Sequence, residues 1–380
     1  MNCGIKGKPL GKHGYNYFCT MLDYMDLFDH FYKGKKVFIT GHTGFKGSWL
    51  SLWLHELGAK VSGFSLEPYT DKDNFVLSGL ASKIEDIRGD IRDARYLDKI
   101  IQGVKPEIVF HLAAQPLVRL SYQEPVETYQ TNLMGSIHVM ESFRRCPSAK
   151  VAVMITTDKC YENKEQIWGY RENEMMGGYD PYSSSKGAAE LAISSWRRSF
   201  MNPKSYEKHG KSIASVRAGN VIGGGDWTND RIIPDCIRAL ETNEAILIRN
   251  PNAIRPWQHV LEPLSGYLLL AKKMWEEPTR YCEGWNFGPN MEAVENVWSI
   301  ASKVIHCYGK GELKDISNPQ ALHEANLLML DIHKAKFELG WQPEMNIDQT
   351  IKMTVDWYRN YQSQDVYQLC LKQIHQYASL

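Results

Sequence analysis

The sequence predicts an α/β protein in which a doubly wound parallel sheet is joined by a smaller, interleaved C-terminal α/β domain. Short apolar segments, typical of buried parallel strands, alternate with helical patterns from about residue 36 to residue 217. A glycine-rich turn connects the first of these strands to the first helix. Beyond Gly219 the alternation gives way to stretches rich in Gly, Asn, Pro and Trp, where we expect the smaller domain.

The first predicted element is a strand at Lys36–Thr40, because this run is apolar and enters a glycine turn. Apolar positions at helical spacing predict a helix over Trp49–Leu57, and Gly58 is suited to end it. A second strand, Lys60–Ser65, follows at once. Strand, turn, helix and strand in this order form a βαβ unit.

The alternation continues along the chain. Further strands are predicted at Glu107–Leu112, Lys150–Thr156 and Lys211–Arg217, with helices at Val126–Arg145 and Tyr182–Phe200. We therefore expect residues 34–220 together with about 255–283 to form the sheet domain. Residues of about 221–254 together with 284–380 are expected to form the smaller domain, and residues 1–33 an N-terminal extension outside the sheet.

Composition limits the classes of protein that this chain can represent. It has 380 residues, is 43% hydrophobic, and balances 44 Lys and Arg against 44 Asp and Glu, so a main role in covering nucleic-acid phosphates is disfavoured. The eight cysteines are scattered and predict reduced thiols without a metal site. No apolar run is long enough to span a membrane, and the N-terminus lacks the pattern of a secretory signal. We expect a cytoplasmic protein.

The turn Gly41-His42-Thr43-Gly44-Phe45-Lys46-Gly47 has GxxGxxG spacing and lies between a predicted strand and a predicted helix. Glycines let the backbone approach a pyrophosphate, and a helix N-terminus offers free N–H groups. This placement predicts a Rossmann dinucleotide site, although glycines that only relieve crowding in a tight turn are the structural alternative. The candidate cofactor residues in the turn are Gly41, Thr43, Gly44, Phe45, Lys46 and Gly47.

The choice between NAD and NADP depends on the end of the second strand. An acidic residue there would favour NAD, whereas the strand ends at Ser65, with Glu67 two residues beyond. We expect NAD, and NADP stays open. Asp90 and Ile91 are further cofactor candidates, because a carboxylate after a short apolar stretch is placed to accept a bond from the adenine amino group; a solvated turn is the alternative.

Tyr182 and Lys186 are the predicted centre of catalysis. Their i, i+4 spacing puts the phenol and the ammonium on one helix face, and we expect the cation to lower the pKa of the phenol toward that of a general base. The strand that ends at Thr156 is followed by Thr157, Asp158 and Lys159, at the edge where open α/β sheets bind ligands. Ordinary polar turn residues are the alternative, less favoured because Tyr182 and Lys186 are present.

Five longer motifs support this prediction. They are Gly41–Leu50, His111–Arg119, Thr157–Tyr161, Arg217–Trp227 and Arg255–Val260. On these residues the chain resembles the extended short-chain dehydrogenase/reductase superfamily over nearly all of residues 34–375. Within that superfamily it is most similar to the CDP-glucose branch of the nucleotide-sugar 4,6-dehydratases.

The resemblance implies a Rossmann domain, a tightly held NAD, CDP-glucose as substrate, and a homo-oligomer, either dimer or tetramer. It implies that Tyr182 takes the 4-hydroxyl proton, Lys186 holds the phenol and the nicotinamide ribose, and Thr157 bonds the 4-oxygen. Hydride leaves C4, water is lost across C5 and C6, and hydride returns to C6. Ala113, Ala114 and Gln115 are implied as further cofactor contacts.

The elimination needs an acid at O6 and a base at H5. Related dehydratases use an acidic pair at this place, whereas this chain has Asp158 and Lys159. We expect Asp158 to be the acid and Lys159 the base. Lys159 must then be desolvated or lie near another cation, since an ordinary Lys stays protonated at neutral pH.

Substrate phosphates are expected to meet arginines, which bind them in a bidentate manner. Arg217, Arg231, Arg249 and Arg255 are candidates to converge on one pyrophosphate. Arg255 is the strongest by resemblance, and the other three are more typical of solvated surface charges, although Arg231 is kept as a candidate. Asn220 is implied as a diphosphate contact, and Arg119 and Ser121 as contacts to the sugar.

Two other functions stay open. Another nucleotide-sugar dehydratase or a 4-epimerase would use the same Tyr182 and Lys186, although an epimerase has no need for Asp158 and Lys159. A non-catalytic Rossmann protein that senses dinucleotides is the alternative of a different class, and it would have no use for the Tyr–Lys pair.

Overall fold

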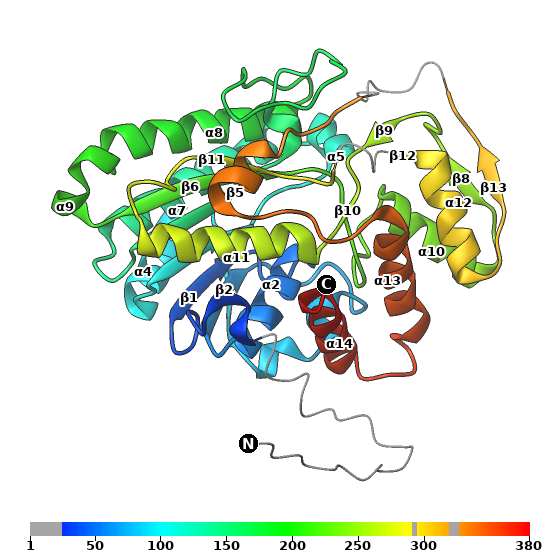
Figure 1. The fold of residues 1–380 in the computed structure, drawn as a ribbon, viewed down its shortest axis with the longest axis horizontal. Helices are drawn as coiled ribbons and strands as arrows, with labels where there is room; N and C mark the ends of the chain where they lie inside the picture. The colour runs from blue at the N-terminus through cyan, green and yellow to red at the C-terminus, as the bar shows by residue number, and fades with distance from the viewer. Residues whose placement is uncertain (1–24, 291–294, 319–326) are drawn as a thin grey trace, which may run out of the picture.

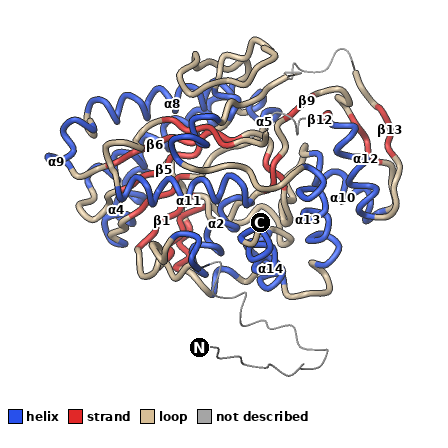
Figure 2. The backbone as a smooth tube through the Cα atoms, viewed as in Figure 1, coloured by secondary structure: helices blue, strands red, loops and turns tan. Residues whose placement is uncertain are grey.

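The computed structural model describes residues 25–290, 295–318 and 327–380. Seven parallel strands form one sheet, in the order β11-β6-β5-β4-β1-β2-β3 (Figures 1 and 2). They are β1 Lys36–Thr40, β2 Lys60–Ser65, β3 Glu85–Arg88, β4 Ile108–His111, β5 Val151–Ile155, β6 Ser212–Ala218 and β11 Gly284–Phe287. The predicted α/β class with a doubly wound sheet is confirmed.

Helices cover both faces of the sheet, which is why its central strands are buried along their whole length. On one face lie α2 Phe45–Glu56 and α11 Leu261–Glu276, and on the other α4 Ala94–Val104, α7 Gly135–Arg145 and α8 Pro181–Ser199. Two buried apolar clusters, one on each side of the sheet, form the core. Because all seven strands are parallel, their carboxyl ends lie along the same edge of the sheet.

Several shorter elements connect these layers. They are η1 Met25–Phe28, α3 Asn74–Leu77, η2 Leu80–Ser82, α5 Val118–Gln123, α6 Pro125–Tyr129, a π-helical turn Gln130–Met134, η4 Asp158–Cys160, η5 Pro203–Ser205 and α9 Tyr206–His209. The predicted helix 126–145 thus consists of α6, the π-helical turn and α7. The predicted helix 49–57 begins earlier, at Phe45, directly inside the glycine turn.

Most of the remaining elements lie beyond the carboxyl edge of the sheet, on the right in Figure 1, whereas the π-helical turn Ala335–Leu339 packs on α11 and β11 and the last helix, Val366–Ala378, packs on α2 and α3. These remaining elements are β7 Val221–Ile222, α10 Ile232–Thr242, β8 Ile246–Ile248, β9 Ile254–Arg255, β10 Gln258–His259, β12 Glu295–Asn296, α12 Val297–Tyr308, β13 Leu313–Asp315, a π-helical turn Ala335–Leu339, α13 Ile347–Asn360 and α14 Val366–Ala378. Small two-stranded sheets pair β10 with β7, β12 with β9 and β13 with β8. The seventh strand of the main sheet, β11, comes from the range expected for the smaller domain, and the domain division stays a prediction.

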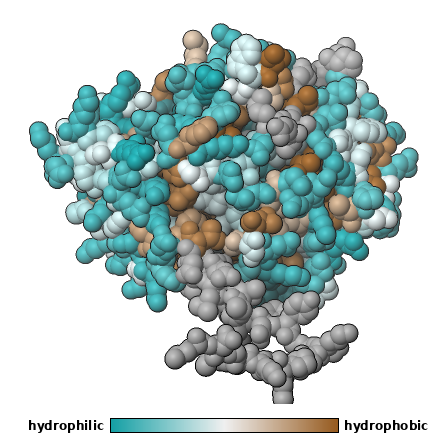
Figure 3. Space-filling model, viewed as in Figure 1, coloured by the Kyte–Doolittle hydropathy of each residue, from teal (hydrophilic) through white to brown (hydrophobic). Residues whose placement is uncertain are grey.

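The end of the expected N-terminal extension packs on the core. Phe28 and Tyr32 are buried, and the Tyr32 hydroxyl donates to the Leu268 carbonyl oxygen of α11 at 2.6 Å. Residues 1–24 lie outside the described residues. In the described part of the chain no helix is both long and apolar enough to cross a membrane. Hydrophobic side chains on the face shown in Figure 3 form separate patches within a mostly hydrophilic surface.

Candidate active site

A cavity of about 550 Å³ opens at the carboxyl edge of the sheet. Its walls come from the glycine turn, the end of β5, the start of α8 and the segments 219–235 and 247–257. Small-molecule sites usually have volumes of this order, and open α/β sheets bind ligands at this edge. Sequence-distant candidates of each kind therefore line one space: Phe45, Lys46 and Ala114 for the cofactor, the five catalytic candidates, and Arg119, Asn220, Arg231 and Arg255 for the substrate. The lining does not include Gly41, Thr43, Gly44, Gly47, Ser65, Asp90, Ile91, Ala113, Gln115 or Ser121.

Two glycines of the turn are required by close backbone approach. Gly41 has φ +77°, and a Cβ there would lie 2.6 Å from the Ala113 backbone nitrogen. A Cβ at Gly47 would lie 2.0 Å from the Gly41 carbonyl oxygen. Gly44 is the N-cap of α2 and has no side chain to cover the helix N-terminus. The turn thus leaves backbone donors accessible, which fits a pyrophosphate.

The other cofactor candidates differ in what they contact. The Thr43 hydroxyl lies 2.8 Å from that of Ser65 and donates to the Leu66 carbonyl, so the turn is tied to the end of β2. Asp90 accepts three bonds from Arg92; these outweigh burial, which acts the other way, and lower the pKa of the carboxyl. Ile91 belongs to the buried core.

The segment after β4 is held by its own hydrogen bonds. The Ala113 N–H donates to the Thr40 hydroxyl and the Gln115 N–H to Asn132. The Gln115 side-chain amide donates to Leu117 and Thr128, so it shapes the loop. Ala114 lines the cavity. The assignment of these three residues to the cofactor stays a prediction.

Positive charge gathers where the glycine turn meets the catalytic residues. Lys46 lines the cavity, and among the described residues no carboxylate lies within ion-pair distance of its ammonium. Burial, together with the charges of Arg231 and Lys186, lowers the pKa of Lys46 to about 8, and Asp158 opposes this shift only in part. Such a site favours an anionic ligand. Together with the glycine turn, it fits the phosphates of a dinucleotide.

The predicted catalytic residues after β5 lie in the cavity wall. The Thr157 hydroxyl donates to Asp158 Oδ1 at 2.9 Å and also caps the short helix η4. Asp158 is buried, and its Oδ2 has no hydrogen-bond partner in the described ranges. Lys159 lines the cavity beside it. A buried carboxyl with one oxygen left over is suited to bond an incoming hydroxyl.

The expected effect of Lys186 on Tyr182 is wrong in this structure. Burial raises the pKa of Tyr182 to about 12, and a hydrogen bond with Thr157 opposes the rise only in part. The Lys186 ammonium donates to the Ile155 carbonyl oxygen at 3.3 Å, and burial lowers its own pKa to about 8. Desolvation dominates because both side chains are almost fully buried.

Ser121 has a different contact from the one expected. Its hydroxyl accepts the Tyr182 N–H at 3.1 Å and donates to the Val118 carbonyl, so it supports the start of α8. Ser121 is fully buried and is absent from the cavity lining. Its assignment to the sugar stays a prediction.

The arginines divide into two groups. Arg119, Arg231, Arg249 and Arg255 line the cavity together with Asn220. Arg119 and Arg249 both contact Asp230, and Arg231 lies 3.6 Å from Asp226. Arg217 is buried in an ion pair with Glu190. Both sequence-based interpretations of Arg217, as a phosphate ligand and as a solvated surface charge, are therefore wrong. Glu190 was not identified from the sequence as a residue near the site. Its position four residues after Lys186, on the same helix face, was the signal that could have found it.

Known proteins place this chain in a family. It matches the model of the family described as GDP-mannose 4,6 dehydratase over residues 38–354. The chain belongs to this family. A relative in the family's reaction class, CDP-glucose 4,6-dehydratase of Salmonella typhimurium, is 53% identical over 330 residues, which cover 87% of this chain and 92% of that protein.

Solved structures show the same fold at lower identity. A dTDP-glucose 4,6-dehydratase from Bacillus anthracis in complex with NAD has a TM-score of 0.72 and 19% identity, covering 86% of this chain and 97% of that one. A UDP-glucose 4-epimerase from Thermotoga maritima with UDP-glucose also has a TM-score of 0.72, at 22% identity, covering 86% and 99%. The GDP-mannose 4,6-dehydratase family and this fold agree with the resemblance seen in the sequence.

Proposed function

We propose that this protein is an NAD-dependent CDP-glucose 4,6-dehydratase, which converts CDP-glucose to CDP-4-keto-6-deoxyglucose and water. The observation that carries the proposal is the 53% identity to the Salmonella enzyme over 87% of the chain. The cavity supports it, because Thr157, Asp158, Tyr182 and Lys186 meet there. When bound, NAD supplies reversible acceptance of a hydride, so no net oxidant is consumed.

The residues of the chain divide the proton transfers. Tyr182 takes the proton of the 4-hydroxyl after losing its own, and Thr157 bonds the same oxygen. The resulting ketone acidifies H5, which Lys159 removes. Asp158 gives a proton to O6 so that the hydroxyl leaves as water. Lys46 binds a phosphate of the dinucleotide, and Arg255 binds the diphosphate of the substrate. Arg231 and Asn220 are further substrate contacts.

Incubation with CDP-glucose, and separately with dTDP-glucose, UDP-glucose and GDP-mannose, each with NAD, tests this function. A product one water lighter from CDP-glucose alone is the expected result. Loss of water from another donor would reassign the nucleotide, and a product of unchanged mass would indicate a 4-epimerase. No product from any donor, with NAD bound, would favour a dinucleotide-sensing protein.

We further infer a cytoplasmic homo-oligomer that serves deoxysugar synthesis for lipopolysaccharide. The interface between copies is proposed at the segment α6–α7 and at α8, which lie against one another and expose Val126, Met134 and Leu191. Apolar side chains exposed on neighbouring helices are typical of an interface between copies. This surface supports a dimer or tetramer.

A further inference from the structure

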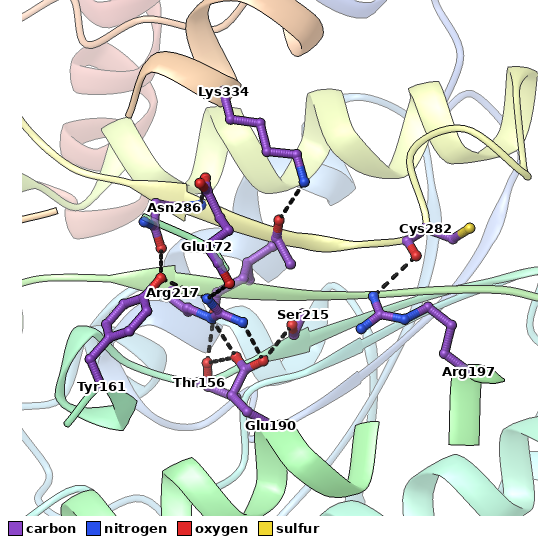
Figure 4. Close-up of polar contacts among 12 residues, drawn as sticks. Thr156, Tyr161, Glu172, Glu190, Arg197, Ser215, Arg217, Cys282, Asn286 and Lys334 are labelled. Atoms are coloured by element: carbon purple, nitrogen blue, oxygen red, sulfur yellow. Dashed lines mark hydrogen bonds and ion pairs between the residues drawn. The ribbon is translucent and has the colours of Figure 1, made fainter. Parts of the chain in front are cut away.

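A buried carboxylate lies one helical turn beyond Lys186 on α8. Glu190 is 3% exposed and accepts hydrogen bonds from side chains of β6 and of the residue that follows β5 (Figure 4). The Thr156 hydroxyl donates at 2.5 Å, the Ser215 hydroxyl at 2.7 Å, and the Arg217 Nε and Nη2 at 3.0 and 2.9 Å. The catalytic steps proposed above give Glu190 no role.

The partner of Glu190 extends the network toward the cavity. Arg217 Nη1 donates to the Tyr161 hydroxyl at 2.6 Å and to the Glu172 carbonyl oxygen at 3.0 Å. The Tyr161 hydroxyl donates in turn to Asn286 of β11 at 2.8 Å (Figure 4). The ion pair therefore joins α8, the end of β5, β6, β11 and the segment after η4, whose residues line the cavity.

Stability alone is a weak reason for such a pair. Desolvating two charges costs about as much as their attraction returns, and apolar replacements of buried pairs are often neutral or stabilising. In some proteins a buried polar pair instead holds one arrangement of polar groups, and the contacts of Glu190 allow this role here.

One hydrogen bond and the place of Glu190 one helical turn after Lys186 connect Glu190 to catalysis. Thr156, which it bonds, is followed directly by Thr157, Asp158 and Lys159, so the carboxylate holds the strand end that presents them. Glu190 also raises the pKa of Lys186 against the larger opposite effect of burial.

The other titratable groups that interact electrostatically with Lys186 come from three elements. Cys160 of η4 has the same direction of effect as Glu190. His111 at the end of β4 and Lys46 at the start of α2 have pKa values that Lys186 lowers, so they face it as potential cations. Among these groups Glu190 is the carboxylate.

We propose that Glu190 is a positioning residue of the dehydration: it fixes the end of β5 through Thr156, and its negative charge stabilises the Lys186 ammonium. This inference rests on the proposed function. Glu190 is absent from the cavity lining, so it acts through these two residues.

The test compares Glu190→Gln with Ser215→Ala. The first keeps the size of the side chain and removes its charge, whereas the second removes one hydrogen bond to the same carboxylate and keeps the charge. We expect Glu190→Gln to lower kcat on CDP-glucose by at least about tenfold with KM changed less than about threefold. Its loss of activity at alkaline pH should begin at lower pH, because Lys186 would lose its proton sooner. Ser215→Ala should keep the wild-type pH profile.

A double variant, Glu190→Gln with Arg217→Met, covers failure to fold, because Glu190→Gln leaves the Arg217 charge unpaired. We expect the double variant to recover the near-UV circular dichroism of the wild type but neither its kcat nor its alkaline limb. Recovery of both would show that Glu190 only neutralises Arg217, and would overturn the proposal. So would a Glu190→Gln variant that behaves as Ser215→Ala does.

The wild type is assayed first, so that two failures are distinguishable. Turnover by the wild type with an unaffected Glu190→Gln variant overturns the role of Glu190 alone. No turnover of any nucleotide sugar by a folded wild type overturns the proposed function and, with it, this inference.

Discussion

At the scale of single residues, burial sets the protonation of the site more than the spacing of charges does. Tyr182 and Lys186 are four residues apart, yet the pKa of Tyr182 is raised to about 12 and that of Lys186 is lowered to about 8. Spacing along a helix gives proximity, whereas desolvation depends on everything packed around the pair. A proton leaving Tyr182 therefore needs the cations gathered around the cavity.

Lys159→Met tests the base of the elimination. We expect C4 oxidation to continue and loss of H5 to stop, because a thioether cannot take a proton. Solvent deuterium at C5, followed by mass spectrometry in D2O, is the measurement. Normal entry of deuterium into C5 in this variant would assign the base to another residue.

Lys46→Met tests the partly buried charge of the glycine turn. Folded Lys46 loses its proton near pH 8, whereas the unfolded chain holds it up to about 10.5, so the unfolded state binds more protons between these values. The Lys46 contribution to stability therefore rises with pH across this window. We expect the variant to be the more stable protein near pH 7 and the wild type to gain relative to it from about pH 8 to 10.

Urea unfolding of both proteins without ligands, at several pH values, measures this difference. Curves that stay parallel across the window would show that Lys46 keeps its proton in the folded protein.

At the scale of the element, the glycine turn joins β1 to α2 through backbone contacts that leave no room for a side chain. Gly47→Ala should move the turn, because its Cβ would lie 2.0 Å from the Gly41 carbonyl oxygen. We expect affinity for NAD, measured by calorimetry, to fall by at least about tenfold, which corresponds to about 1.4 kcal/mol.

Gly103→Ala in α4 is the matched control, since a Cβ there meets no atom within 4 Å. It should leave affinity for NAD unchanged and stabilise the helix by up to about 1 kcal/mol. Equal affinity in the Gly47 and Gly103 variants would remove the turn from the cofactor site.

At the scale of the whole molecule, α6–α7 and α8, the helix that carries Tyr182 and Lys186, present exposed apolar side chains. Leu191 on α8 is 62% exposed. We expect Leu191→Asp to convert the proposed oligomer to monomers, because a charge would be desolvated in the interface. Light scattering after size exclusion measures the mass.

Glu207→Ala, on the short helix α9 outside this surface, is the control and should keep the wild-type mass. An oligomer that survives Leu191→Asp would place the interface elsewhere.

Local pattern by itself determined much of this protein. Strands β1, β2, β4, β5 and β6, the glycine turn and the helical spacing of Tyr182 and Lys186 all follow from periodicity and from residues that suit a turn. Neither β3 nor α4 was predicted from the sequence. Strand β3 is short and polar because it lies at the edge of the sheet, so it lacks the apolar pattern of the other strands.

Only the tertiary structure decided which distant residues meet. In the folded chain β11 lies at the edge of the main sheet, and Arg217 is buried against Glu190. Sequence patterns could not show either pairing, because the partners lie far apart in the chain. The tertiary structure also reversed the expected pKa direction of Tyr182, since desolvation depends on the whole surrounding core. Periodicity is a property of neighbours in sequence; burial and charge pairing are properties of neighbours in space.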